Sequence, residues 1–346
     1  MEEKNVIDVM APAAIFYTSG STSRPKGVVH SHRSLLAMLN TFIDAGDLTS
    51  EDRFLVCESM SNASGCCHAF SSSLVGGSAL IISEFNIPEF IKALDKSPTI
   101  LCIMGRGNYD IVHEEFLTKE HFKSVKMNLS GGDKITQTLI DEFKEKTGVP
   151  IRYGYGMSEF LMFTINKSEE REKGTSVGTV LKNVTLELRD GNNCVVDDEG
   201  ELWAKGENMM LGYWDDEIQT KKTVIDGWLR TGDLLRRDKE GYYWFRGRIK
   251  QMIVREGDNV SPLEIEEVFS KHPAIKIVAV VGVPDSIEGA VPKAFVQLKE
   301  GVEATEQELI EFARKYLAEY KVPVAVQFLG CFPRTASGKI ARKELF

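Results

Sequence analysis

The stretch YTSGSTSRPKGVVHSH (Tyr17–His32) lies between a predicted strand and a predicted helix, and it sets the order of the elements that follow. The run before it, AAIFYT (Ala13–Thr18), is short and apolar, as expected for a buried strand. At its other end, Ser31 can cap a helix over SHRSLLAMLNTFIDA. We therefore interpret the stretch as a loop between a strand and a helix.

The same order of strand and helix recurs in the residues that follow. Strands are expected in LVGGSALIIS (74–83), PTILCIMG (98–105), KSVKMNLSGGD (123–133) and PIRYGYGMSE (150–159), and helices in IPEFIKALDKS (87–97) and ITQTLIDEFKEKTG (135–148). Such alternation predicts an α/β fold with a helix-covered, largely parallel sheet. Its ligand loops are expected at the carboxyl ends of the strands.

From Thr175 onward the pattern changes to short strands separated by tight turns, which predicts an antiparallel β-rich section. After Arg248 two helical and two strand-like segments predict a small α+β C-terminal domain. We expect the first domain to occupy residues 1–248 and the small domain to occupy residues 249–346. A length of 346 residues agrees with about two domains.

Composition excludes several classes of function. A formal net charge of −9 argues against a surface that binds nucleic acid. The six cysteines show no C-x-x-C pair, so neither a zinc module nor a disulfide framework is indicated, and a reducing, cytoplasmic setting fits. No apolar run approaches the roughly 18 residues needed to span a bilayer, and the first residues lack the pattern of a signal peptide. We expect a soluble protein.

The opening loop is rich in groups that bind anions. It contains hydroxyls, glycines and one lysine: Thr18, Ser19, Gly20, Ser21, Thr22, Lys26 and Gly27. Small residues let the backbone approach an anion closely, and N–H groups with a lysine can neutralise a polyphosphate. Because Gly27 follows Lys26 where the Walker pattern requires a hydroxyl, an ordinary P-loop NTPase is disfavoured. The alternative is a solvated surface loop.

A second motif, YGYGMSE (Tyr153–Glu159), ends a predicted strand. It supplies an aromatic ring that can stack on a base, a hydroxyl, and a carboxylate suited to Mg²⁺. The alternative is a glycine-rich turn with one exposed glutamate. Two further motifs follow, RTGDLLRRDKEGYYWFRGR (230–248) and PRTASGKIARKEL (333–345).

These four motifs, in this order, resemble the signature motifs of the adenylate-forming superfamily of AMP-binding enzymes. That superfamily includes acyl-CoA synthetases and aryl- and coumarate-CoA ligases, and the resemblance runs from about Tyr17 to the C-terminus. It implies a ligase that uses ATP, Mg²⁺ and CoA. A carboxylate attacks the α-phosphate of ATP to give an acyl adenylate, and a thiol then takes the acyl group.

The resemblance also implies roles for particular residues. The loop Thr18–Lys26 would cradle the β- and γ-phosphates. In the second motif Tyr155, followed by Gly156, would stack on adenine, Ser158 would touch phosphate, and Glu159 would bind Mg²⁺. The remaining contacts to the nucleotide and the acyl group would come from Gly131, Gly132 and Asp133, from Asp233 at the ribose hydroxyls, and from Arg248 near ribose and phosphate.

Lys339 matches the lysine that bridges the attacking carboxylate and the α-phosphate. Its chemistry can be stated independently, because two anions must approach before a bond forms and a cation between them offsets their repulsion. The alternative is a solvated lysine in the tail. By the same resemblance Lys250 stands at the hinge of a mobile small domain, and Gly257 and Asn259 would serve the thiol step unless they form a plain turn.

The acyl pocket is the least defined part of the predicted site. Asn62 stands where related ligases often carry an aromatic residue or histidine and where amino-acid-activating domains carry an aspartate. A neutral amide does not offset a buried ammonium, so an amino-acid substrate is disfavoured. Asn62 can equally be a turn residue, and Asp133 occupies a place where small or apolar residues are usual. The acid itself, and whether CoA or a carrier-protein thiol accepts it, stay open.

Full-length members of the superfamily carry a further subdomain before the phosphate loop, whereas this sequence starts a few residues ahead of it. We therefore expect a partial AMP-binding domain whose uncovered apolar surface favours self-association or a partner chain. Two functions follow from this. One is an active acid–thiol ligase, and the other is a nucleotide-binding fragment or subunit that is inactive without the missing part. His68, His113 and His121 have no ligand-like spacing and receive no role.

Overall fold

The computed structural model describes residues 7–18, 25–132, 135–334 and 340–345. Their contacts divide the chain into two compact units. The first unit contains Met1–Thr231 with Arg237–Trp244, and the second contains Gly232–Arg236 with Phe245–Phe346. The domain boundary at residue 248 and the hinge at Lys250 stay predictions, and each unit is described by itself.

A seven-stranded sheet forms the centre of the first unit, in the order β4-β3-β5-β6-β7-β8-β9. Its strands are β3 (Arg53–Val56), β4 (Ser78–Ile81), β5 (Ile100–Cys102), β6 (Met127–Gly131), β7 (Ile151–Tyr155), β8 (Thr164–Asn166) and β9 (Thr179–Val180). From β4 to β7 neighbouring strands run parallel, and β8 and β9 add antiparallel pairs. The predicted parallel sheet is confirmed.

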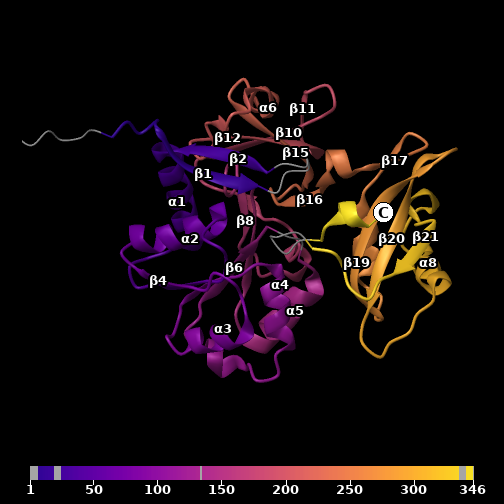
Figure 1. The fold of residues 1–346 in the computed structure, drawn as a ribbon, viewed down its shortest axis with the longest axis horizontal. Coiled ribbons are helices and arrows are strands. Elements are labelled where there is room, and N and C mark those ends of the chain that lie inside the picture. Colours follow the sequence, from indigo (N-terminus) through magenta and orange to yellow (C-terminus); the bar gives the residue numbers. More distant parts are fainter. Residues whose placement is uncertain (1–6, 19–24, 133–134, 335–339, 346) are drawn as a thin grey trace, which may run out of the picture. The chain divides into compact units, whose positions relative to one another are not determined.

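Helices cover both faces of this sheet (Figure 1). They are α1 (His32–Gly46), α2 (Ala63–Leu74), α3 (Ile87–Leu94), α4 (Gly105–His113) and α5 (Gln137–Thr147). Successive side chains of β3 point to opposite faces of the sheet, so neighbouring residues of this strand pack against different helices. Phe54 packs with Phe42 of α1, whereas Leu55 packs with Phe90 of α3 and Phe143 of α5.

The predicted loop after Thr18 is partly wrong, because Lys26–Ser31 forms strand β2. β2 pairs antiparallel with β1 (Pro12–Thr18), and β13 (Gly212–Tyr213) completes a three-stranded sheet. Two adjacent valines favour a strand here, and both are buried. Ser31 caps α1 as predicted, since its side chain accepts a hydrogen bond from the backbone N–H of Ser34.

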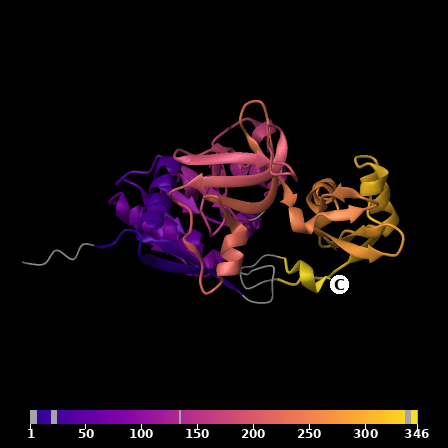
Figure 2. The ribbon, with the colours of Figure 1, turned by 90° about the horizontal axis from the view of Figure 1, so that it is seen from above.

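The expected antiparallel section is confirmed as a six-stranded sheet, whose pink and salmon strands are seen in Figure 2. The strand order is β11-β10-β12-β15-β14, and β16 pairs with β15. The elements are β10 (Val184–Arg189), β11 (Val195–Val196), β12 (Glu199–Gly206), α6 (Glu217–Thr223), β14 (Val224–Ile225), β15 (Trp228–Arg237) and β16 (Tyr243–Arg248). β15 and β16 contribute residues to both units.

The rest of the second unit is a small α+β fold, as predicted. Its elements are β17 (Ile253–Arg255), β18 (Asp258–Val260), α7 (Pro262–Phe269), β19 (Ile275–Asp285), β20 (Gly289–Leu298), α8 (Glu306–Arg314) and β21 (Ala325–Phe328). The strand order is β18-β17-β20-β19, with β21 parallel to β20. Short 3₁₀ helices in the chain are η1 (Lys119–Phe122), η2 (Arg171–Lys173), η3 (Ile249–Gln251), η4 (Glu319–Lys321) and η5 (Arg342–Glu344).

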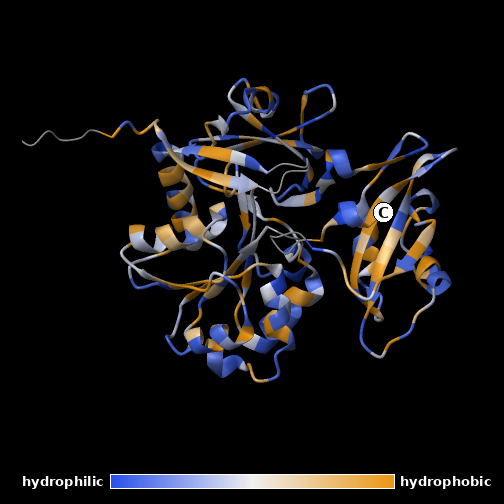
Figure 3. Cartoon of the chain, in the orientation of Figure 1, coloured by the Kyte–Doolittle hydropathy of each residue, from blue (hydrophilic) through white to orange (hydrophobic). Residues whose placement is uncertain are grey.

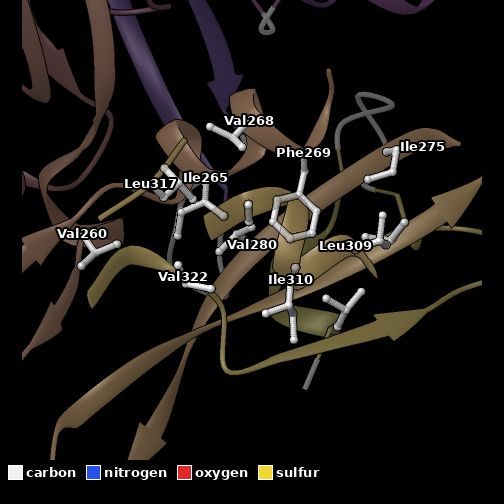
Figure 4. Close-up of a cluster of buried hydrophobic side chains, with 14 of the residues drawn as sticks. Val260, Ile265, Val268, Phe269, Ile275, Val280, Leu309, Ile310, Leu317 and Val322 are labelled. Atoms are coloured by element: carbon white, nitrogen blue, oxygen red, sulfur yellow. The ribbon is translucent and has the colours of Figure 1, made fainter. Parts of the chain in front are cut away.

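This unit has its own hydrophobic core, in which side chains from α7, α8 and the sheet turn toward one another (Figure 4). Phe269 and Leu309 are almost fully buried within it. α8 carries both hydrophobic and hydrophilic residues, as expected for a helix with one buried face (Figure 3). Among the described residues of the whole chain, no helix is long and apolar enough to cross a membrane.

Candidate active site

The β1–β2 hairpin brings Thr18 opposite Lys26 at the last described pair of its ladder. The ammonium of half-buried Lys26 lies 5.1 Å from the centre of the Tyr213 ring, a cation–π distance. Both residues that flank the predicted phosphate loop are therefore held by the three-stranded sheet. Ser19, Gly20, Ser21 and Thr22 lie outside the described residues, so their proposed contacts stay predictions.

The YGYGMSE motif forms the end of β7 and the tight turn that leads to β8. The carbonyl of Met157 accepts hydrogen bonds from the backbone N–H groups of Phe160 and Leu161, at 3.0 and 2.7 Å. Gly156 is required by a close approach, because a Cβ added there would lie 1.6 Å from the carbonyl oxygen of Leu161. The ring of Tyr155 lies 5.4 Å from that of Phe163. The motif thus forms a hydrogen-bonded, closely packed turn at the carboxyl end of β7.

Glu159 is buried in this turn, with 7% of its surface exposed, so it is not the exposed glutamate of the alternative interpretation. The Tyr213 hydroxyl donates a hydrogen bond to Glu159 Oε1 at 2.7 Å. Burial and the neighbouring Glu159 carboxylate raise the pKa of Tyr213 above its ordinary value, so the phenol keeps its proton. The Glu159 carbonyl also accepts from the backbone N–H of Met210 at 2.9 Å.

A magnesium ion would be held here by few protein ligands. In the described part of the chain, no group of three or more His, Cys, Asp or Glu side chains could hold a metal ion. Mg²⁺ bound with a nucleotide usually takes one or two carboxylates and completes its shell with phosphate oxygens and water. A single buried carboxylate such as Glu159 fits that pattern.

His30 of β2 supports the same turn, and the sequence analysis missed it. Its Nε2 donates to the carbonyl oxygen of Ser158 at 2.8 Å, and its Nδ1 lies 3.1 Å from Ser34 Oγ. Burial lowers the pKa of His30, although the hydrogen bond to Ser158 opposes the shift. A neutral imidazole with its proton on Nε2 satisfies this geometry. His30 of β2 thus holds the backbone of Ser158, and Tyr213 of β13 holds the side chain of Glu159.

The end of the neighbouring strand β6 carries Gly131 and Gly132. Gly131 pairs with Gly154 of β7, and a Cβ on Gly131 would lie 2.7 Å from the Gly154 carbonyl oxygen. Only glycine fits between these strand ends. Asp133 lies outside the described residues. Asn62 is the exposed N-cap of α2, and its side chain makes no capping hydrogen bond, so its assignment to the acyl pocket stays a prediction.

In the second unit, Asp233 and Arg248 are paired. Asp233 is buried, and its Oδ1 lies 3.3 Å from Nε of Arg248, whose side chain is 48% exposed. A buried carboxylate whose arginine partner reaches solvent can accept hydrogen bonds from a diol beside the pair. Their predicted contacts to ribose stay predictions.

The other predicted residues of the second unit lie on short elements. Lys250 is exposed on η3. Glu256 and Gly257 both have positive φ and form the turn between β17 and β18, where Asn259 pairs with Val254. The plain-turn alternative therefore agrees with the backbone, and the thiol-step role stays a prediction. Lys339 lies outside the described residues.

The chain belongs to the AMP-binding enzyme family. Its sequence matches that family over residues 2–214 and the AMP-binding enzyme C-terminal domain over residues 264–339. It is 34% identical to a 2-succinylbenzoate–CoA ligase of Bacillus cytotoxicus, covering 99% of this chain and 71% of the relative. It is also 34% identical to the 4-coumarate–CoA ligase-like 4 protein of Oryza sativa subsp. japonica, over 96% of this chain and 62% of that protein.

Solved structures show the same fold. ATP-bound MatB from Rhodopseudomonas palustris superposes with a TM-score of 0.92 at 28% identity, over 97% of this chain and 68% of that one. The o-succinylbenzoate CoA synthetase MenE from Bacillus subtilis, in complex with the acyl adenylate OSB-AMP, gives 0.87 at 28% identity, over 97% and 69%. The chain thus spans about two thirds of the length of these proteins.

Proposed function

We propose that this protein activates a carboxylic acid with ATP and transfers the acyl group to the thiol of CoA. The observation that carries the proposal is the buried Glu159 carboxylate, joined through Tyr213 to Lys26 at the base of the phosphate loop. The relatives support it, since the names of both curated relatives are those of CoA ligases or ligase-like proteins and one solved relative holds an acyl adenylate.

In the first step, a carboxylate oxygen forms a bond to the α-phosphorus, and the bond from that phosphorus to the bridging oxygen breaks. Pyrophosphate leaves with the electron pair. Lys26 and the loop that it closes would bind the β- and γ-phosphates, Tyr155 and Gly132 would flank the adenine, and the Asp233–Arg248 pair would bind the ribose. Mg²⁺, bound at Glu159, would neutralise phosphate charge.

In the second step, the thiol sulfur attacks the acyl carbon, AMP leaves, and the thiol proton passes to solvent. We propose that the small domain serves both steps. Lys339 would bridge the carboxylate and the α-phosphate in the first, Lys250 would act as the hinge, and Gly257 and Asn259 would meet the adenylate in the second. A change in the position of the small domain would bring different residues to the active site in the two steps.

The acid is proposed to lack an ammonium group near its carboxylate, because Asn62 and Gly131 offer no counter-charge. CoA is the proposed acceptor, in agreement with the names of the relatives. All six cysteines are free of disulfides, although Cys57, Cys67 and Cys102 are buried, and this fits the reducing cytoplasm that we propose as the compartment.

Glu159→Gln is expected to raise the Mg²⁺ concentration needed for half-maximal ATP–pyrophosphate exchange by about 10-fold, because an amide is a weaker ligand than a carboxylate. The measurement is the rate of ATP–pyrophosphate exchange at increasing Mg²⁺ concentration, with each of a panel of carboxylic acids as substrate. Glu169→Gln is a suitable control, since Glu169 is an exposed residue of the same unit. An unchanged titration would remove Glu159 from the metal site, and the absence of any acid-dependent exchange would contradict the proposed function.

A further inference from the structure

One residue outside the sequence motifs contacts both halves of the proposed phosphate and metal site. The Tyr213 hydroxyl donates to Glu159 Oε1 at 2.7 Å, and the Tyr213 ring faces the ammonium of Lys26 at 5.1 Å. Lys26, Glu159 and Tyr213 come from three separate segments of the first unit. Tyr213 is the described side chain that connects the other two.

The backbone around Tyr213 is tightly held, so its side chain has a fixed origin. Tyr213 pairs with Val28 of β2, and the neighbouring backbone N–H groups of Leu211 and Trp214 donate to the carbonyls of Val29 and Gly27 at 2.8 and 2.7 Å. The backbone N–H of Tyr213 itself donates to Thr220 Oγ1 at 2.8 Å. β13 is thus hydrogen-bonded to the strand that carries Lys26.

We propose that Tyr213 is a positioning residue that sets the Glu159 carboxylate for the metal and Lys26 for the phosphates. The inference rests on the proposed function. The hydroxyl hydrogen-bonds to Oε1 and restrains the carboxylate, whose other oxygen, Oε2, would bind the metal. The ring attracts the lysine cation to one side of the hairpin. The hydroxyl and the ring of Tyr213 therefore have separate proposed roles, the first toward Glu159 and the second toward Lys26.

The hydroxyl and the ring can be tested separately with the full chain, using Mn²⁺ and ATP as probes. Binding of Mn²⁺ in the presence of ATP is followed by electron paramagnetic resonance, and binding of ATP without metal is followed by calorimetry. Tyr213→Phe is expected to weaken Mn²⁺ binding by about 10-fold, as loss of a partner behind a metal ligand does, with metal-free ATP binding within about 2-fold of wild type. Tyr213→Leu is expected to weaken both.

A double substitution distinguishes positioning of Glu159 from a general loss of structure. In the Glu159→Gln background, Tyr213→Phe is expected to change Mn²⁺ binding by less than about 2-fold, because the carboxylate that it orients is gone. Tyr242→Phe is the matched control, since Lys173 Nζ lies 4.7 Å from the centre of the Tyr242 ring, whereas the hydroxyl that donates to Glu159 is that of Tyr213. It is expected to leave both affinities unchanged.

Two outcomes would overturn the inference, and they differ from failure of the proposed function. If Glu159→Gln weakens Mn²⁺ binding while Tyr213→Phe matches wild type, Tyr213 does not position the carboxylate. If Tyr213→Phe is equally harmful with and without Glu159, its effect is structural. If the wild-type chain shows no ATP-dependent Mn²⁺ binding at all, the proposed function fails and the inference fails with it.

Discussion

Replacing Lys339 by alanine is expected to slow formation of the acyl adenylate by roughly 10²- to 10³-fold, which is the usual loss when one preorganised electrostatic contact is removed. The carboxylate and the α-phosphate are both anionic, and their repulsion is about 4 kcal/mol per charge pair at 4 Å and intermediate dielectric. A lysine between them offsets much of this cost. Alanine leaves the repulsion in place at the moment of bond formation.

The measurement is acid-dependent ATP–pyrophosphate exchange, which reports the first step alone. Lys343→Ala serves as the control, because Lys343 is an exposed lysine in the same tail and has no proposed role. Thioester formation from added acyl adenylate should survive in Lys339→Ala, since the second step does not need the bridge. Equal exchange in wild type and Lys339→Ala would contradict the role.

Replacing Glu58 by glutamine is expected to lower the free energy of unfolding by about 3–5 kcal/mol, the usual cost of breaking a buried ion pair from one side. Glu58 and His68 are each 6% exposed, and Glu58 Oε1 lies 3.2 Å from His68 Nδ1. The His68 ring also packs 4.4 Å from that of Phe42. Glutamine would leave a buried imidazolium without its counter-charge.

The pH dependence of stability tests the same pair. Burial opposes protonation of His68, but Cys102 and Glu58 together outweigh it and raise the pKa of His68 to about 10. Because the pKa of His68 is higher in the folded than in the unfolded state, its protonation stabilises the fold, and this contribution is complete at any pH below the unfolded-state pKa of about 6.5. This stabilisation is lost between pH 6.5 and 10, at about 1.4 kcal/mol per pH unit.

Urea unfolding of wild type, Glu58→Gln and His68→Gln from pH 6 to 9 measures both effects. The wild-type free energy should fall more steeply with pH than that of His68→Gln. Glu217→Gln is the control for loss of an ion pair, because the Lys221–Glu217 pair is exposed and should contribute at most about 1 kcal/mol. Identical slopes in wild type and His68→Gln would show that His68 is not charged in the fold.

The sequence was sufficient to predict the architecture because hydrophobic pattern and local capping decide it. The strands and helices predicted between residues 74 and 159 are confirmed, although α4 (Gly105–His113) was not predicted, and the change to antiparallel strands after Thr175 is also confirmed. Ser31 caps α1 because capping depends on residues only three positions apart. Such signals depend on residues close together in the chain, so they can be recognised from a single sequence.

The missed features depend on distant partners. β2 is a strand because β1 and β13 lie on either side of it, whereas Pro25 just before it and Gly27 at its second position favour a loop. His30 meets Ser158 across 128 positions, and Tyr213 meets Glu159 across 54. His68 received no role, because its partner Glu58 lies ten positions earlier, before α2 begins, and the pair has no recognised spacing. The roles of Lys339 and the loop residues 19–22 stay predictions.

The link from Lys26 through Tyr213 to Glu159 also bears on how the protein is made. A ribosome completes Glu159 well before Tyr213, which lies 54 positions later. At about 5–20 residues per second this interval lasts roughly 3–11 s. Throughout it the nascent chain already carries the hairpin lysine and the glutamate but lacks the tyrosine that joins them. The proposed positioning of Glu159 by Tyr213 therefore begins only after residue 213 has been translated.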